Sequence, residues 1–65
     1  MSELLESISY DNANAAQKAD EARTAAGEYE DDGYKNVNVR NVPDIVGHGA
    51  NAYQDGGRYE IWGEG

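Results

Sequence analysis

The sequence predicts an α+β domain in which one alanine-rich helix packs on a small, mainly antiparallel sheet of three to four strands, in the order β-α-β-β-β. Three observations favour this class. Residues 12–26 are rich in alanine and lack glycine and proline, residues 34–42 alternate apolar and polar side chains, and Asp55-Gly56-Gly57 is typical of a tight turn. With 65 residues, the chain is expected to form a single small domain over 1–65.

The first ten residues allow two interpretations. Leu4 and Ile8 are spaced as on one face of a helix, but together with Tyr10 they also fit the period of two of a strand. The β-branched and aromatic side chains of Ile8 and Tyr10 favour extended backbone. We therefore predict a strand over 4–10, with a helix as the alternative.

The segment 12–26 is the strongest helix signal in the chain, because seven of its residues are alanine. Asp11 or Asn12 is a suitable N-cap, and Gly27 stands where a helix-ending glycine is common. We therefore predict a helix over 12–26. Its expected sheet-facing side is a stripe of four alanines at helical spacing, namely Ala15, Ala19, Ala22 and Ala26.

The second half of the chain begins with a predicted half-buried strand over 34–42, in which valines alternate with polar residues. Pro43 is expected to end this strand, because proline cannot donate a ladder hydrogen bond. Residues 43–50 contain two glycines and are expected to form a loop. The apolar pair Ile45 and Val46 is expected to tuck back onto the sheet.

Two further strands, 50–54 and 58–62, are predicted on either side of a turn at Asp55-Gly56-Gly57. In the last strand, Tyr59 and Ile61 share one face. The opposite face then carries Arg58, Glu60 and Trp62.

Composition excludes several classes of protein. The absence of cysteine excludes disulfides and thiolate metal sites, and no segment approaches the roughly 20 apolar residues that span a bilayer. The N-terminus is acidic, unlike a signal peptide, so we expect a soluble cytoplasmic protein, in a host cell if the protein is viral. A net charge of −8 disfavours direct binding of nucleic acid.

No catalytic or cofactor-binding motif is found, so we expect neither enzyme activity nor a cofactor. His48 is the single histidine, and it lies between two glycines without a nucleophile or acid at motif spacing. The acidic run from Glu28 resembles an EF-hand loop only in part. Val39 occupies the position of the bidentate glutamate, so we expect no metal site.

The chain is also short of core-forming side chains, because only nine of its 65 residues are leucine, isoleucine or valine and it has no phenylalanine. This fraction, together with the high net charge, is typical of chains that are marginally stable alone. A partner surface or a homo-oligomer is therefore an expected source of order.

The acidity is concentrated in residues 1–33, where nine acids oppose Lys18 and Arg23 and give a net charge of −7, against −1 for residues 34–65. Clustered carboxylates of this kind can imitate the phosphates of a nucleic acid and bind a groove rich in lysine and arginine. Glu3, Glu6 and Asp11 are possible extensions of the surface. The candidate partner-binding residues are Asp20, Glu21, Glu28, Tyr29, Glu30, Asp31 and Asp32.

Tyr29 is included because an exposed ring among acids suits docking against arginine side chains.

The leading hypothesis is a small acidic protein-binding module that inhibits a nucleic-acid-binding host protein by occupying its basic surface. In size, acidity and lack of cysteine, the chain resembles the small inhibitor proteins of bacterial viruses, including anti-CRISPR proteins. The alternative is a small structural or assembly protein, for example a virion component, that is ordered by its neighbours.

Overall fold

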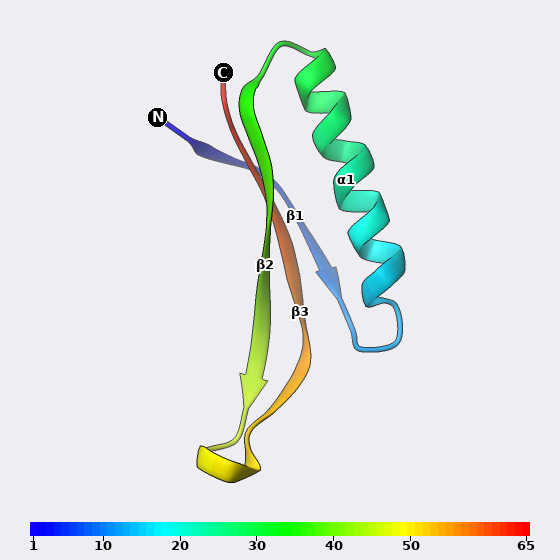
Figure 1. Ribbon diagram of the computed structural model, residues 1–65, viewed down its shortest axis with the longest axis vertical. Helices are drawn as coiled ribbons and strands as arrows, with labels where there is room; N and C mark the ends of the chain where they lie inside the picture. Colours follow the sequence, from blue (N-terminus) through cyan, green and yellow to red (C-terminus); the bar gives the residue numbers. More distant parts are fainter.

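The computed structural model describes all 65 residues and contains one helix and a three-stranded antiparallel sheet (Figure 1). The α+β class predicted from the sequence is confirmed. No helix in the structure has both the length and the apolar character needed to cross a membrane. The elements are β1 (Glu3–Tyr10), α1 (Ala15–Asp31), β2 (Lys35–Val46), a single 3-10 turn (Gly49–Asn51) and β3 (Tyr53–Glu64).

The last strand, β3, is the centre of the sheet, in the strand order β1-β3-β2. It pairs antiparallel with both neighbours, so that Tyr59 is opposite Ile8 in β1 and Asn41 in β2. The strand predicted over 4–10 is confirmed as β1. An irregularity between Leu4 and Glu6 interrupts its pairing with β3, as is common in edge strands.

The helix covers one face of the sheet, and a thin core lies between them. Ala22 and Ala26 of the predicted alanine stripe are buried, and small side chains at these positions let the helix backbone approach the strands closely. Ile61 of β3 is the only large side chain that is fully buried. Tyr10 and Tyr59 extend this core, with their rings stacked at 4.6 Å between centroids.

The helix begins and ends later than its sequence pattern predicts. Its N-cap is Asn14, while the Asp11 carboxylate accepts hydrogen bonds from the backbone N–H groups of Ala13 and Asn14 in the preceding turn. At the other end, the helix continues through Gly27 to Asp31. The helix-ending glycine is Gly33, whose φ of 102° is a conformation that other residues rarely adopt.

Pro43 does not end β2, which continues to Val46 with an irregularity between Pro43 and Ile45. Because β2 is an edge strand, the missing N–H of proline need not remove a ladder hydrogen bond. The expectation that Ile45 and Val46 tuck back onto the sheet is wrong. They are 62% and 40% exposed, because this part of β2 extends beyond the helix.

The turn predicted at Asp55-Gly56-Gly57 is also wrong, because both glycines lie inside the continuous strand β3 and are buried. A Cβ on Gly56 would lie 2.5 Å from the carbonyl oxygen of Tyr10, and one on Gly57 would lie 2.7 Å from that of Val42. These glycines therefore permit close approach of backbone. The chain instead reverses direction around the 3-10 turn at Gly49–Asn51.

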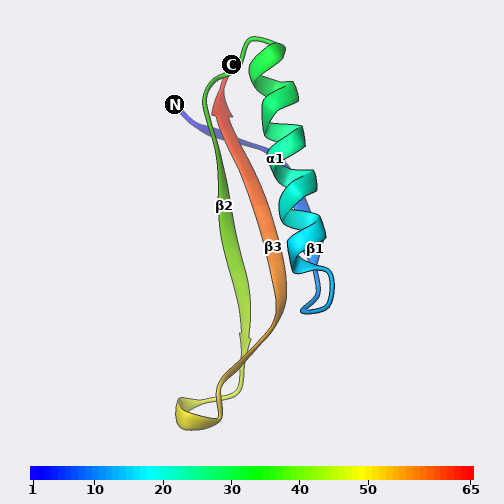
Figure 2. The ribbon, with the colours of Figure 1, turned by 45° about the vertical axis from the view of Figure 1, so that its right-hand side comes forward.

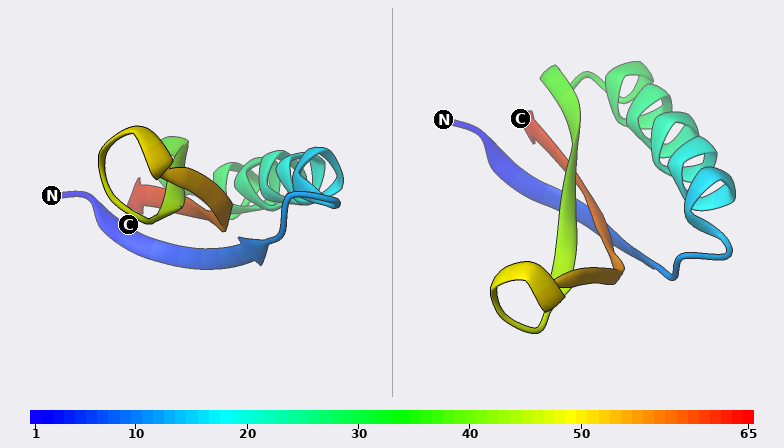
Figure 3. Two further views of the ribbon diagram at one scale, coloured as in Figure 1. Left: turned by 90° about the horizontal axis from the view of Figure 1, so that it is seen from below. Right: turned by 60° about the horizontal axis from the view of Figure 1, so that its bottom comes forward.

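The molecule is long and thin for its size. Residues 44–46 of β2 and 53–55 of β3, joined through the 3-10 turn, form a two-stranded arm. The arm projects past the helix, as Figures 1 and 2 show from two directions. Seen end-on in Figure 3, the helix lies to one side of the strands. The Cα extents are 44 × 25 × 11 Å. The radius of gyration of 13.6 Å exceeds the value of about 11 Å expected for a compact domain of this length.

Replacing Gly27 with alanine tests where the helix ends. Nothing lies within 4 Å of the position that a Cβ would take, and Gly27 is inside the helix. We expect Gly27→Ala to raise the free energy of unfolding by about 1 kcal/mol, measured by urea denaturation, because alanine is the better helix former. A loss of stability would instead indicate that the helix ends at Gly27 in a glycine-specific conformation.

Candidate functional site

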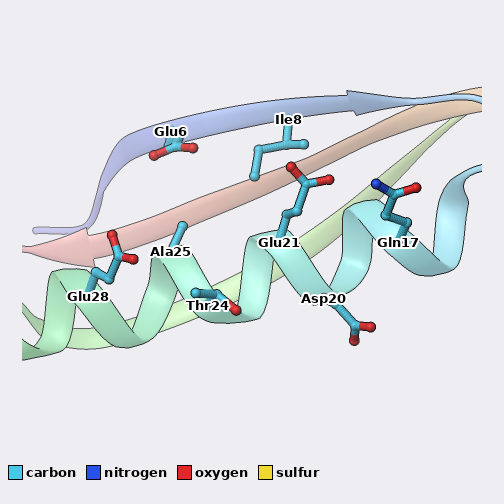
Figure 4. Close-up of a pocket in the computed structure, with 8 residues that line it drawn as sticks. All are labelled: Glu6, Ile8, Gln17, Asp20, Glu21, Thr24, Ala25 and Glu28. Carbon is cyan, nitrogen blue, oxygen red and sulfur yellow. The ribbon is translucent and has the colours of Figure 1, made fainter.

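The predicted partner-binding residues all lie on α1 or directly after it. Their acids form two groups, which share Glu28. Asp20, Glu21 and Glu28 line an open groove of about 490 Å³ between α1 and β1. In Figure 4, Glu21 and Glu28 project towards β1, whereas Asp20 points away from it. The other lining residues are Glu6, Ile8, Gln17, Thr24 and Ala25, so the groove contains four carboxylates and no basic side chain.

Two of the groove acids are partly neutralised by neighbours on the helix. Lys18 Nζ lies 3.2 Å from Glu21 Oε2, and Arg23 forms an ion pair with Asp20. Such exposed pairs contribute little to stability, but they compensate charge locally. The middle of the helix is therefore less acidic than its sequence suggests.

The second group is the acidic turn, defined as Glu28, Glu30, Asp31 and Asp32. Glu30, Asp31 and Asp32 are exposed, and none of the four residues forms a salt bridge. No basic residue lies in the last turn of the helix. Because the C-terminal end of a helix carries partial negative charge, acids here are unfavourable by about 0.3–1 kcal/mol each at low salt. This is the most concentrated uncompensated charge in the molecule.

Tyr29 does not have the exposed position expected for a docking residue. Its ring is half-buried and packs edge-on against Tyr34, with 5.4 Å between ring centroids. Its hydroxyl has a single proton, which two acceptors share: Glu6 Oε1 at 3.0 Å and the carbonyl oxygen of Leu5 at 3.3 Å. The bond to Glu6 is the main cause of a raised pKa for Tyr29. Tyr29 therefore positions the acidic turn by holding the end of α1 against β1.

The three possible extensions of the surface are dispersed. Glu6 lies in the groove, while Glu3 lies at the start of β1. Asp11 precedes the N-terminal end of α1, whereas the acidic turn is at the other end. No group of three or more histidine and acidic side chains is arranged to hold a metal ion.

The sequence did not reveal a second polar cluster, on the face of the sheet turned away from α1. Glu60 is only 9% exposed, and both of its carboxylate oxygens are hydrogen-bonded. Arg58 Nε donates to one oxygen at 3.0 Å and Trp62 Nε1 to the other at 3.1 Å, which lowers the pKa of Glu60. Arg40 of β2 lies over the Trp62 ring, 5.3 Å from its centroid. Part of this cluster could have been predicted, because Arg58, Glu60 and Trp62 alternate along one strand. The position of Arg40 beside them depends on the register between β2 and β3, for which the sequence has no local signal.

Comparison of the chain with models of protein families, with curated proteins and with solved structures finds no match.

Removing the Tyr29 hydroxyl tests its positioning role. We expect Tyr29→Phe to lower the free energy of unfolding by about 1 kcal/mol, because its hydrogen bonds to Leu5 and Glu6 are lost. Tyr34→Phe is the matched control, since Tyr34 contributes its ring to the same pair. Urea denaturation of both variants provides the measurement. Equal effects would show that the Tyr29 hydroxyl has no special role.

The buried Glu60 predicts an acid-sensitive contribution to stability. Its pKa is lowered in the folded state from an ordinary value of 4.5, so the contribution is complete above that value and is lost as the pH falls through the folded pKa. We expect Glu60→Gln to have a lower Tm than the unmodified protein at about pH 7, with a difference that narrows towards about pH 3. A difference that is independent of pH would contradict this role.

Proposed function

We propose that the protein is a small acidic binding module whose acidic turn and adjoining groove occupy a basic surface on a nucleic-acid-binding protein. The observation that carries the proposal is the uncompensated acidic turn at the C-terminal end of α1. Four carboxylates gather where the helix dipole disfavours them, and no salt bridge offsets them. A sequence under selection for stability alone would favour lysine or arginine here.

The chemistry of the surface favours a partner that binds phosphate. Grooves that bind nucleic acid gain affinity when lysine and arginine displace the counterions of a polyanion, and a compact row of carboxylates can exploit the same side chains. Occupation of such a groove would exclude the nucleic acid, so the module would act as an inhibitor and nucleic-acid mimic. Association is expected to be fast and sensitive to salt. The inhibitors of bacterial viruses, including anti-CRISPR proteins, are the functional class that fits this behaviour.

A second candidate is a structural or assembly protein that is ordered by its neighbours. The thin core favours it, because Ile61 is the only large side chain that is fully buried. The projecting arm also leaves Ile45 and Tyr53 exposed to 62% and 59%. A stable, folded monomer at micromolar concentration would count against this candidate.

Charge reversal separates function from stability in the acidic turn. We expect Asp31→Lys with Asp32→Lys to weaken capture of basic proteins by the immobilised chain at about 50 mM salt, because the attraction to their grooves is lost. The same change should slightly raise Tm, because it places cations at the helix C-terminus. Capture is measured from the heparin-binding fraction of a cell lysate, and the retained proteins are identified by mass spectrometry.

The matched control is Asp44→Lys with Asp55→Lys, which changes the net charge equally but lies on the exposed part of the arm. We expect this control to capture the same proteins as the unmodified chain. If the two double variants lost capture to the same extent, net charge alone would explain it and the acidic turn would have no specific role.

A further inference from the structure

Strand β1 has a free edge beside the acidic groove. The strand order β1-β3-β2 leaves β1 paired on one side only, and its pairing with β3 is regular from Glu6 to Tyr10. In an antiparallel edge strand, every second residue directs its backbone N–H and C=O groups away from the neighbouring strand. The Leu5 carbonyl, just before the regular stretch, is bonded by the Tyr29 hydroxyl of the helix. Residues 6–10 therefore offer a further strand a place to pair.

The two edges of the sheet are protected in different ways. The outer edge of β2 contains Pro43, which has no N–H, and its pairing with β3 is irregular near both ends. Such features hinder the addition of a strand. The edge of β1 is instead guarded by charge, because the side chain of Glu6 lies in the groove. A carboxylate in this position repels an acidic strand and favours a basic one.

One end of the groove carries negative charge that the chain does not compensate. Glu6 of β1 and Glu28 of α1 lie towards the same end in Figure 4. Tyr29, the neighbour of Glu28 in the chain, bonds to Glu6, which also places the two carboxylates close together. Neither of them forms a salt bridge. A cationic side chain between them would therefore meet two free carboxylates.

The rest of the groove is of a different character. Ile8 and Ala25 are its two hydrophobic lining residues, and Ile8 is half-buried. Glu21 is already paired with Lys18, so this part of the groove has less charge to offer. Side chains of a strand point to one face at every second residue, as Glu6 and Ile8 do. A strand added beside β1 thus meets a carboxylate at one position and an apolar side chain two residues away.

We propose that the edge of β1 and the groove bind an extended segment of a basic protein, which joins the sheet as a fourth strand. An arginine or lysine of the segment is placed opposite Glu6, where it also reaches Glu28, and an apolar side chain two residues away is placed opposite Ile8. Backbone pairing supplies affinity, and this pair of side chains supplies specificity. Nucleic acid and a second copy of this chain are disfavoured occupants, because a net charge of −8 repels both.

The inference deepens the proposed function and rests on it in one respect, namely that the partner is basic. It adds which part of the partner is recognised, an extended strand, and where that strand binds. The groove shares Glu28 with the acidic turn, so the two contacts can form one continuous surface.

The test uses a short peptide, acetyl-Gly-Val-Thr-Arg-Thr-Val-Gly-amide, and the ¹⁵N-labelled protein. Its apolar residues flank arginine symmetrically, so the pattern fits β1 in parallel or antiparallel orientation. Titration to about 5 mM peptide at about 50 mM salt should shift the amide signals of residues 6–10 and of the groove side of α1, but not those of β2. A peptide that is N-methylated at its three central residues keeps the charge but cannot pair, and it should cause no such shifts.

Matched variants test the two carboxylates. Glu6→Gln with Glu28→Gln should weaken binding of the peptide at least about fivefold, because both free carboxylates are removed. Glu3→Gln with Glu30→Gln changes the net charge equally on the same two elements, but both residues lie outside the groove. This control should bind within about twofold of the unmodified protein. Circular dichroism verifies that each variant is folded.

Three results would overturn the inference: no shifts in residues 6–10, equal binding of the N-methylated peptide, or equal weakening by the two double variants. The titration needs no captured protein, so its outcome is independent of the proposed function. Capture of basic proteins without peptide binding would reject the strand-binding site alone. Peptide binding without any capture would reject the proposed function alone.

Discussion

The fold is organised around Ile61 in the central strand β3, the one large side chain that is fully buried. Both outer strands are bonded to β3, and the helix packs over it through alanines. Because little else is removed from water, stability also relies on polar contacts at the margins of this core. The stacked pair Tyr10 and Tyr59, the hydroxyl of Tyr29 and the buried carboxylate of Glu60 are such contacts.

The same scarcity of apolar side chains explains the shape and the charge distribution. The helix is long enough to cover only part of the β2–β3 ribbon, so the arm beyond it is exposed on both faces. With few apolar contacts, the helix end is held by Tyr29, and this arrangement fixes where the acidic turn is displayed. The scarcity of apolar side chains therefore affects the candidate binding surface, because the polar contacts of Tyr29 hold the helix end that carries the acidic turn.

The fold class and most strands could be predicted because alternation and alanine content are local signals. The helix end could not, since Gly27 and Gly33 are both suitable glycines, and the packing of Tyr29 against β1 selects the later one. Gly56 and Gly57 have the local signature of a turn, yet they serve the close approach of Tyr10 and Val42. The seven candidate site residues could be placed on or beside one helix from the sequence. The half-buried position of Tyr29 could not, because it depends on contacts with Leu5 and Glu6 of β1. The polar cluster around Glu60 was missed because it joins residues of different strands.

The central claim is that the acidic turn competes with nucleic acid for a basic groove. The most direct test uses a basic protein that the chain captures and a labelled DNA duplex bound to that protein. Fluorescence anisotropy reports whether the duplex stays bound. Titration with the unmodified protein should release the duplex, with an apparent affinity that weakens steeply as salt is raised. The account would be contradicted if the duplex stayed bound to the basic protein while that protein was also saturated with the 65-residue chain.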